Sequence, residues 1–237
     1  MQSKFIHFYI VVHKKELIDK FEQEKKYERV ENYTYLLVGN HPVNYTSDKI
    51  IQCEHLPNNI EHRKNFLAYT GWYAICNNTE MREEYACLLE YDTTLTDDFN
   101  LDTLSKEIRS KGVDMYGIAR LNINCCFLNN DVFTSGMIDF LKSEGIQGLT
   151  TNNTEWMVSN NIFIRPSTLR DLTDSDLARR CFQFMKLDNH MNGHYLERFT
   201  TVFCFLQNRR FDFAGEKMFC HPALDSHGTM HAYRTGA

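Results

Sequence analysis

The sequence predicts an α/β fold with a mostly parallel central sheet flanked by helices. Two observations carry this prediction. Short apolar segments alternate with helical ones along the first half, and the fourth apolar segment is hydrophobic almost throughout. Parallel strands joined by helical crossovers produce this alternation, because helices then cover the sheet on both faces. With 237 residues, 43% of them hydrophobic, the chain is long enough for one domain over residues 1–237 with a sizeable core.

The first half supplies the strands and helices in turn. Its predicted strands are Phe5–Val12, Tyr35–Val38, Ile50–Cys53, Tyr85–Glu90 and Met115–Ala119. Its predicted helices are Lys14–Phe21, Asn65–Asn77 and Leu101–Ser110. The first strand is rich in Ile and Val, the second ends at Gly39-Asn40, and the helix from Asn65 places its aromatic residues on one face.

The second half is more mixed. It predicts a strand at Ile162–Arg165, one or two helices within Ser167–Met185, a long amphipathic helix at Gly193–Asn208 and a last strand at Lys217–Cys220. The tail from His221 is polar and irregular. Because ligands of parallel sheets bind beyond the carboxyl ends of the strands, the candidate site residues are those that directly follow the strands of the first half.

Composition excludes several classes of protein. The net charge of -5 and the lack of a Lys/Arg block argue against a nucleic-acid partner. Eight cysteines without a Cys-x-x-Cys pair indicate buried, reduced thiols rather than a zinc site, as in cytoplasmic proteins. No segment approaches the ~20 apolar residues of a membrane span. We therefore expect a cytoplasmic protein. Its ending at Gly236-Ala237 is also compatible with a domain cut from a longer chain.

The segment Glu90-Tyr91-Asp92 carries the main chemical signal. A buried strand ends there in two carboxylates one residue apart, and residues i and i+2 of a strand point to the same side. We expect Glu90 and Asp92 to converge just outside the sheet, where a hard cation such as Mn²⁺ or Mg²⁺ would stabilise them. The alternative is a strand that simply ends in an acidic loop.

This segment resembles the Asp-x-Asp region of GT-A glycosyltransferases, with Glu90 in place of the first Asp. The resemblance implies that Arg63 and Asn65, with Lys64 beside them, contact the nucleotide at a helix start, and that Val12-His13 hold its base. It extends in element order over about residues 4–228 and is similar in style to small transferase domains of bacteria and of large DNA viruses such as the chlorella viruses.

The resemblance also implies a general base in the second half of the chain. Inverting members carry an acidic residue near the start of a helix, which matches Glu197 in Gly193-His194-Tyr195-Leu196-Glu197. Such a base takes the proton of the acceptor hydroxyl. Asp188 and His194 are alternatives for this role, and a surface ion pair is the alternative reading of Glu197 itself.

Two further groups follow from the same resemblance. A C-terminal His completes the metal site in some GT-A families, and His227 is our candidate, with His221 and Asp225 as alternatives. In the region before Pro166, Trp156 is expected to stack on a sugar, and Asn160 and Asn161 to bond its hydroxyls. Trp156 is equally compatible with a place in the core.

The implied activity is metal-dependent transfer of a hexosyl or deoxyhexosyl group from a UDP-sugar to the hydroxyl of a carbohydrate or glycoprotein acceptor, with inversion. A retaining mechanism stays open. About residues 1–120 would bind the nucleotide and about residues 121–237 the acceptor.

Three alternative functions remain. The first is a nucleotidyltransferase, although no Gly-rich loop follows the first strand, and the second is a metal-dependent hydrolase, although no His-x-His occurs. The third is a non-catalytic sugar-binding domain.

Overall fold

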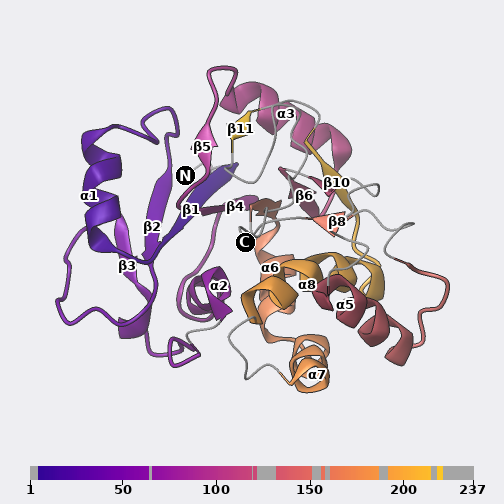
Figure 1. The fold of residues 1–237 in the computed structure, drawn as a ribbon. Helices are drawn as coiled ribbons and strands as arrows, with labels where there is room; N and C mark the ends of the chain where they lie inside the picture. The colour runs from indigo at the N-terminus through magenta and orange to yellow at the C-terminus, as the bar shows by residue number, and fades with distance from the viewer. Residues whose placement is uncertain are drawn as a thin grey trace, which may run out of the picture.

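The computed structural model describes residues 5–63, 66–118, 120–121, 132–150, 156–157, 161–186, 192–214 and 218–220. Its centre is a seven-stranded sheet in the order β10-β6-β9-β4-β1-β2-β3 (Figure 1). These strands are β1 (Ile6–Val12), β2 (Tyr33–Leu37), β3 (Ile50–Gln52), β4 (Tyr85–Glu90), β6 (Met115–Gly117), β9 (Ile162–Ile164) and β10 (Phe211–Phe213). Two short antiparallel pairs join β5 (Thr94–Leu95) to β11 (Phe219–Cys220) and β7 (Arg120–Leu121) to β8 (Trp156–Met157).

The sheet is mostly parallel, as predicted. β1 pairs in parallel with β2 and β4, β2 with β3, and β6 with β10. β9 is the exception, since it runs antiparallel between β4 and β6. The sequence indicated a strand at this position but not its direction or its neighbours.

The helices match most of the predicted segments. They are α1 (Lys15–Gln23), α2 (Ala68–Asn78), α3 (Leu101–Lys111), α5 (Val132–Ser143), α6 (Pro166–Asp174), α7 (Asp176–Met185) and α8 (Asn192–Leu206), with a short 3-10 helix η1 (Cys53–His55). Asn100 caps α3 by accepting a hydrogen bond from Thr103 N at 2.9 Å, and Gly112 ends it in the left-handed region. The segment after Pro166 forms two helices because Ser175 caps a new one.

Strand alternation gives the sheet two separate cores. In β1, Phe8, Ile10 and Val12 enter one cluster of buried residues, whereas Tyr9 and Val11 enter the other. The first cluster packs under α1 and α3, and we call this side the α1–α3 face. The second packs under α2, α5, α6, α7 and α8, which gather on the opposite side in Figure 1, and we call it the α2–α8 face.

One helix was not predicted from the sequence. α5 contains Gly136 in its middle, which is unfavourable in a helix by about 1 kcal/mol relative to Ala. The glycine permits a close approach between helices, because a Cβ there would lie 2.9 Å from Met185 Cε and 3.1 Å from Tyr195 Cε1. Within the described ranges, no helix has the length and apolar character needed to cross a bilayer.

Candidate functional site

The carboxyl ends of three strands meet at one edge of the sheet. Val12 lies opposite Leu37 of β2, and Val11 lies opposite Glu90 of β4. The exposed His13 packs edge-on against Tyr91, with 4.7 Å between the ring centroids. The structure therefore brings together the ends of β1, β2 and β4, where the sequence placed the nucleotide.

A buried asparagine holds the turn that follows β4. Thr93 N donates to Glu90 O at 3.0 Å and closes the turn. Asn161 Oδ1 accepts from Glu90 N at 2.8 Å and from Thr93 Oγ1 at 2.9 Å. Both Asn161 and Thr93 are fully buried. The backbone of this turn, residues 90–93, is thus fixed from inside the protein, and we call it the acidic turn.

This geometry corrects the role expected for Asn161. A fully buried side chain whose Oδ1 serves the turn does not face a sugar hydroxyl, so that expectation is wrong. Asn161 instead positions the acidic turn. The residue directly precedes β9, and only the antiparallel pairing of β9 with β4 brings it there. The role of Asn161 in positioning the turn could not be predicted from the sequence, because the sequence does not reveal that β9 pairs with β4.

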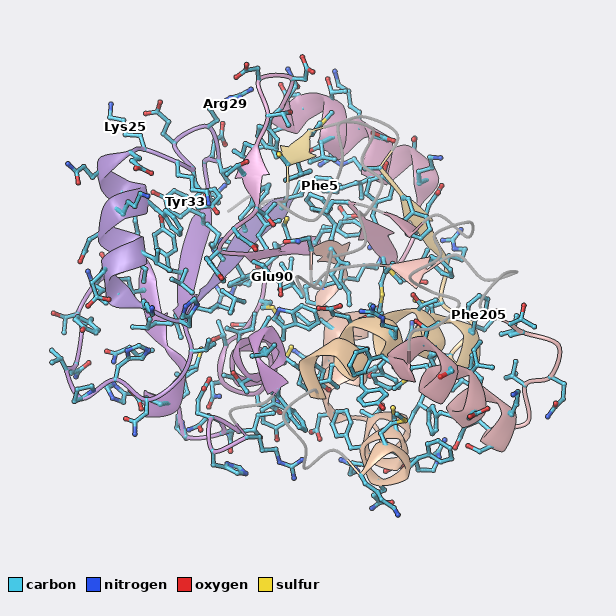
Figure 2. The ribbon with its side chains drawn as sticks, in the orientation of Figure 1. Phe5, Lys25, Arg29, Tyr33, Glu90 and Phe205 are labelled. Carbon is cyan, nitrogen blue, oxygen red and sulfur yellow. The ribbon has the colours of Figure 1, made fainter. Side chains whose placement is uncertain are left out.

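The convergence of Glu90 and Asp92 on one point stays a prediction, because the strand rule does not reach both residues. β4 ends at Glu90, so the i and i+2 relation does not extend to Asp92. Alternation along β4 puts Glu90 on the side of Leu88, on the α2–α8 face, and Figure 2 shows it between the sheet and α2. Burial raises the pKa of Tyr27, which belongs to the α1–α3 face, and the charge of Asp92 adds to that shift.

Lys26 packs against the acidic turn. Its Nζ donates to Tyr91 O at 2.6 Å and lies 4.2 Å from the centroid of the Phe21 ring. Burial lowers the pKa of Lys26 to about 8, and the neighbouring Asp92 opposes that shift. Lys26 thus contributes a positively charged group beside the acidic turn.

The described residues do not complete a metal site. In the part of the chain that the structure describes, no group of three His, Cys, Asp or Glu side chains is placed to hold an ion. The predicted third ligand, His227, lies outside the described residues, as do its alternatives His221 and Asp225. A divalent cation at Glu90 and Asp92 stays a prediction.

The loop before α2 is tied to the end of β2. Glu61 Oε2 accepts from Gly39 N at 2.8 Å, and burial raises the pKa of Glu61 although this hydrogen bond opposes the shift. Arg63 follows on the surface, 5.3 Å from the centroid of the buried Phe66 ring. Arg63 is thus held at the same edge as the strand ends. Asn65 and Lys64 lie outside the described residues.

α8 begins beside the start of α2. A Cβ on Gly193 would lie 2.5 Å from Leu67 Cδ1, so glycine is needed for this contact. One turn further along, Glu197 forms an ion pair with Arg198, and their side chains are 11% and 2% exposed. The predicted base is therefore a largely covered carboxylate beside a buried guanidinium, on the α2–α8 face.

Other predicted site residues cannot be placed. Asp188 and Asn160 lie outside the described residues, and so do the side chains of Trp156 and His194. The backbone of Trp156 belongs to β8, where it pairs with Leu121. Both readings of Trp156, stacking on a sugar and packing in the core, stay predictions.

Comparison with known proteins supports the fold. No family model matches the sequence, and no curated protein sequence is similar to it at a significant level. Among solved structures, the bifunctional glycosyltransferase WbbM in its apo form matches 92% of this chain with a TM-score of 0.59 and 12% identity. The chain has a GT-A-like fold. It spans 45% of the WbbM chain. The yeast mannosyltransferase Ktr4p from S. cerevisiae matches 94% of this chain and 71% of its own, at 12% identity and a TM-score of 0.47, which is too low to add to the argument.

Proposed function

We propose that this chain is a glycosyltransferase domain that moves a sugar from a nucleotide-sugar, a UDP-sugar in the first instance, to an acceptor hydroxyl. The observation that carries the proposal is the GT-A-like fold, shared with a glycosyltransferase over 92% of the chain. The candidate residues at the ends of β1 and β4 support it, because those ends lie side by side at the carboxyl edge, where sheets of this kind bind ligands.

The edge offers suitable groups for a nucleotide. His13 and Tyr91 present an exposed aromatic pair at the end of β1 and β4. Arg63 stands one turn before α2, where a guanidinium and a helix N-terminus together favour a diphosphate. Mn²⁺ or Mg²⁺, if bound at Asp92 and Glu90, would offset the charge of the leaving diphosphate. We assign no step to the ion, since the described residues do not complete its site.

Glu197 is the proposed general base. It would accept the proton of the acceptor hydroxyl while that oxygen attacks the anomeric carbon and the nucleoside diphosphate leaves from the opposite face, which inverts the configuration. Arg198 compensates the charge of the Glu197 carboxylate and fixes its direction. The acceptor would be a carbohydrate or a glycoprotein. A cytoplasmic location and a place in a longer protein belong to the same proposal.

A second candidate is a domain that binds a nucleotide-sugar without transferring it. The observation that favours it is the lysine beside the acidic turn, since Lys26 Nζ donates to Tyr91 O and Asp92 opposes the lowering of the Lys26 pKa by burial, so a protein cation already offsets part of the charge of the turn. This candidate predicts binding of UDP without turnover of any UDP-sugar.

Calorimetry of UDP tests the proposal. We expect the wild type to bind UDP with Mn²⁺ and to lose most of the affinity with chelator, and Asp92→Ala to lose this metal dependence. Asp139→Ala is the matched control, because Asp139 is an exposed acid on α5. Failure of the wild type to bind UDP, GDP and other nucleoside diphosphates would overturn the proposal. Binding without turnover of any nucleotide-sugar would favour the second candidate.

A further inference from the structure

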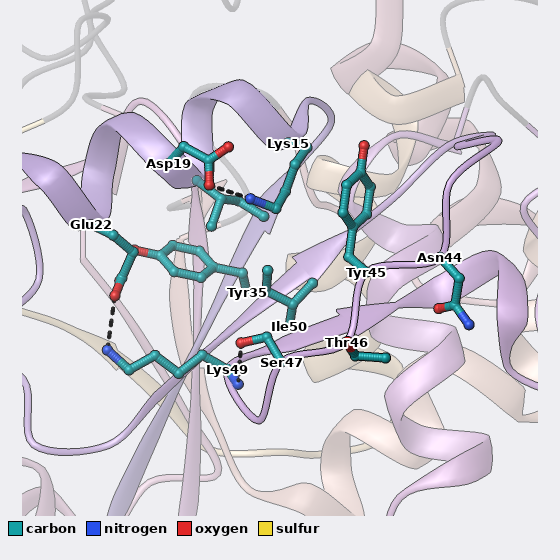
Figure 3. A pocket seen from close by; sticks show the side chains of 11 residues that line it. Lys15, Asp19, Glu22, Tyr35, Asn44, Tyr45, Thr46, Ser47, Lys49 and Ile50 are labelled. Carbon is teal, nitrogen blue, oxygen red and sulfur yellow. Dashed lines mark hydrogen bonds and ion pairs between the residues drawn. The ribbon is translucent and has the colours of Figure 1, made fainter.

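A polar cavity lies on the flank of the sheet, away from the acidic turn. It has a volume of about 400 Å³, is open to solvent on one side, and is lined by residues of α1, β2 and β3 and of the segment 44–49 (Figure 3). Its buried wall belongs to the α1–α3 face, through Ile18 and Tyr35. No residue of the acidic turn or of α8 lines it, so the cavity is distinct from Glu90 and from Glu197. Its volume falls in the range of small-molecule sites, roughly 300–1,000 Å³.

The charges of the cavity are paired within it. Lys15 forms an ion pair with Asp19, and Lys49 Nζ lies 2.9 Å from Glu22 Oε2. Glu22 Oε1 also accepts from Tyr35 Oη at 2.9 Å. Two cations thus face two carboxylates, as the dashed lines in Figure 3 show. The two positive and two negative charges of the lining balance, so the cavity offers no net charge to attract a phosphate or a carboxylate, which favours a ligand without net charge.

The lining also offers an aromatic ring and several polar groups. The half-buried Tyr45 stands beside Lys15, whose Nζ lies 5.4 Å from the centroid of the ring. Asn44, Thr46 and Ser47 are exposed at the rim. An amphipathic ring next to amide, hydroxyl and carboxylate groups matches a sugar, which presents apolar C–H groups on one face and hydroxyls around its edge.

The loop of the cavity is held in place without a ligand. Gln52 is buried, with 6% exposure, and its Nε2 donates to Val43 O at 2.9 Å. Its Oε1 accepts from Tyr45 N at 2.6 Å. The buried Gln52 of β3 therefore holds the backbone of Tyr45 in place. Less conformational entropy is then lost when a ligand binds.

We propose that this cavity binds a neutral carbohydrate. The proposal rests on the paired charges, the half-buried ring of Tyr45 and the fixed loop, and binding itself does not require transferase activity. A role as an anchor for the acceptor glycan rests on the proposed function. The position of the cavity favours this role as an anchor. Lys15 in its lining is two residues after His13 at the carboxyl edge, and the segment 44–49 belongs to the loop that begins at that edge, where β2 ends.

Titration with defined saccharides tests this site. We would add trisaccharides of glucose, mannose, galactose and N-acetylglucosamine to the protein without nucleotide, and follow backbone resonances by NMR, with inorganic phosphate and trigalacturonate as charged probes. At least one neutral trisaccharide is expected to shift resonances of residues 44–50. Tyr45→Ala should weaken that binding about tenfold and Tyr45→Phe should retain it. Tyr73→Ala, on α2, is the matched control.

Three outcomes would overturn the proposal: no neutral trisaccharide shifts these resonances, the charged probes bind more tightly, or Tyr45→Ala binds as the wild type does. The Tyr45→Phe and Asn44→Ala variants keep the test valid if Tyr45→Ala folds poorly. UDP calorimetry separates this proposal from the proposed function. Saccharide binding without binding of UDP, GDP or another nucleoside diphosphate would leave the cavity assigned and the transferase rejected, and the reverse result would reject only the cavity.

Discussion

Two groups of carboxylates, one on each face of the sheet, differ in how their charge is handled. On the α2–α8 face, two carboxylates are drawn inward, although others of that face stay at the surface: Glu61 is 9% exposed, and the Glu197 side chain is 11% exposed beside the buried Arg198. On the α1–α3 face, the carboxylates of Asp19 and Glu22 stay at the surface and each has its own lysine. Exposed pairs of this kind stabilise a protein by about 0–1 kcal/mol, whereas a buried carboxylate is costly unless it is compensated.

Under the proposed function, this difference assigns proton transfer to the covered carboxylates of the α2–α8 face and binding alone to the cavity of the α1–α3 face. A covered carboxylate can take part in proton transfer, because its surroundings are low in water and its direction is fixed. Surface pairs that neutralise one another offer hydrogen bonds without a strong field, which suits an uncharged ligand. The acidic turn directly follows β4, at the carboxyl edge where the two faces meet.

The largest expected effect is on Glu197. Glu197→Gln keeps the shape of the side chain but removes its ability to accept a proton. With a UDP-sugar that the wild type turns over, kcat should fall roughly 100- to 10,000-fold while the affinity for UDP stays unchanged. Steady-state kinetics and UDP calorimetry check this. Glu144→Gln, at the end of α5, is the control; equal activity of Glu197→Gln and the wild type would exclude Glu197 as the base.

A smaller effect is expected at Asn161, where the two faces meet. Asn161→Ala leaves Glu90 N and Thr93 Oγ1 without their buried acceptor, and this should lower the free energy of unfolding by about 2–4 kcal/mol. Urea denaturation measures it. Asn58→Ala removes an exposed asparagine and should cost less than about 0.5 kcal/mol. If the two variants lose the same stability, Asn161 does not fix the acidic turn.

The smallest expected effect is on how the free energy of unfolding depends on pH, and it should have opposite signs for Glu61 and Glu22. Burial raises the pKa of Glu61, so the folded state holds the proton more tightly than the unfolded state does. The stability that this provides is full below the unfolded pKa and is lost as pH rises through the folded pKa. Glu61→Gln should therefore gain stability relative to the wild type as pH rises from 4 to 7. Glu22→Gln should lose stability over the same range, because hydrogen bonds from Tyr33, Lys49 and Tyr35 outweigh burial and lower the pKa of Glu22.

Unfolding free energies from urea curves at several pH values would show the two trends. Parallel pH profiles for the two variants would contradict the contrast between the faces.

Local sequence patterns were enough for the elements of the first half. The Ile- and Val-rich run of β1 and the apolar β4 predicted parallel strands, and the pairings of β1 confirm them. The direction of β9 could not be read in this way, since it depends on which strands it joins. The same limit affects the site: the sequence indicated the acids of the turn, but neither Asn161 nor the direction of Asp92 follows from spacing along β4.

The placement of Asn161 has a consequence for how the protein matures during synthesis. Glu90 and Thr93 of the acidic turn are made 71 and 68 positions before the asparagine that fixes them. β1, β2, β3 and β4 can pair as soon as they have been made, but the turn gains its buried acceptor only after β9 has inserted between β4 and β6. Contacts so distant in sequence form slowly. A nascent chain that stops short of residue 161 would thus carry the strands of the edge while lacking the conformation of its acids.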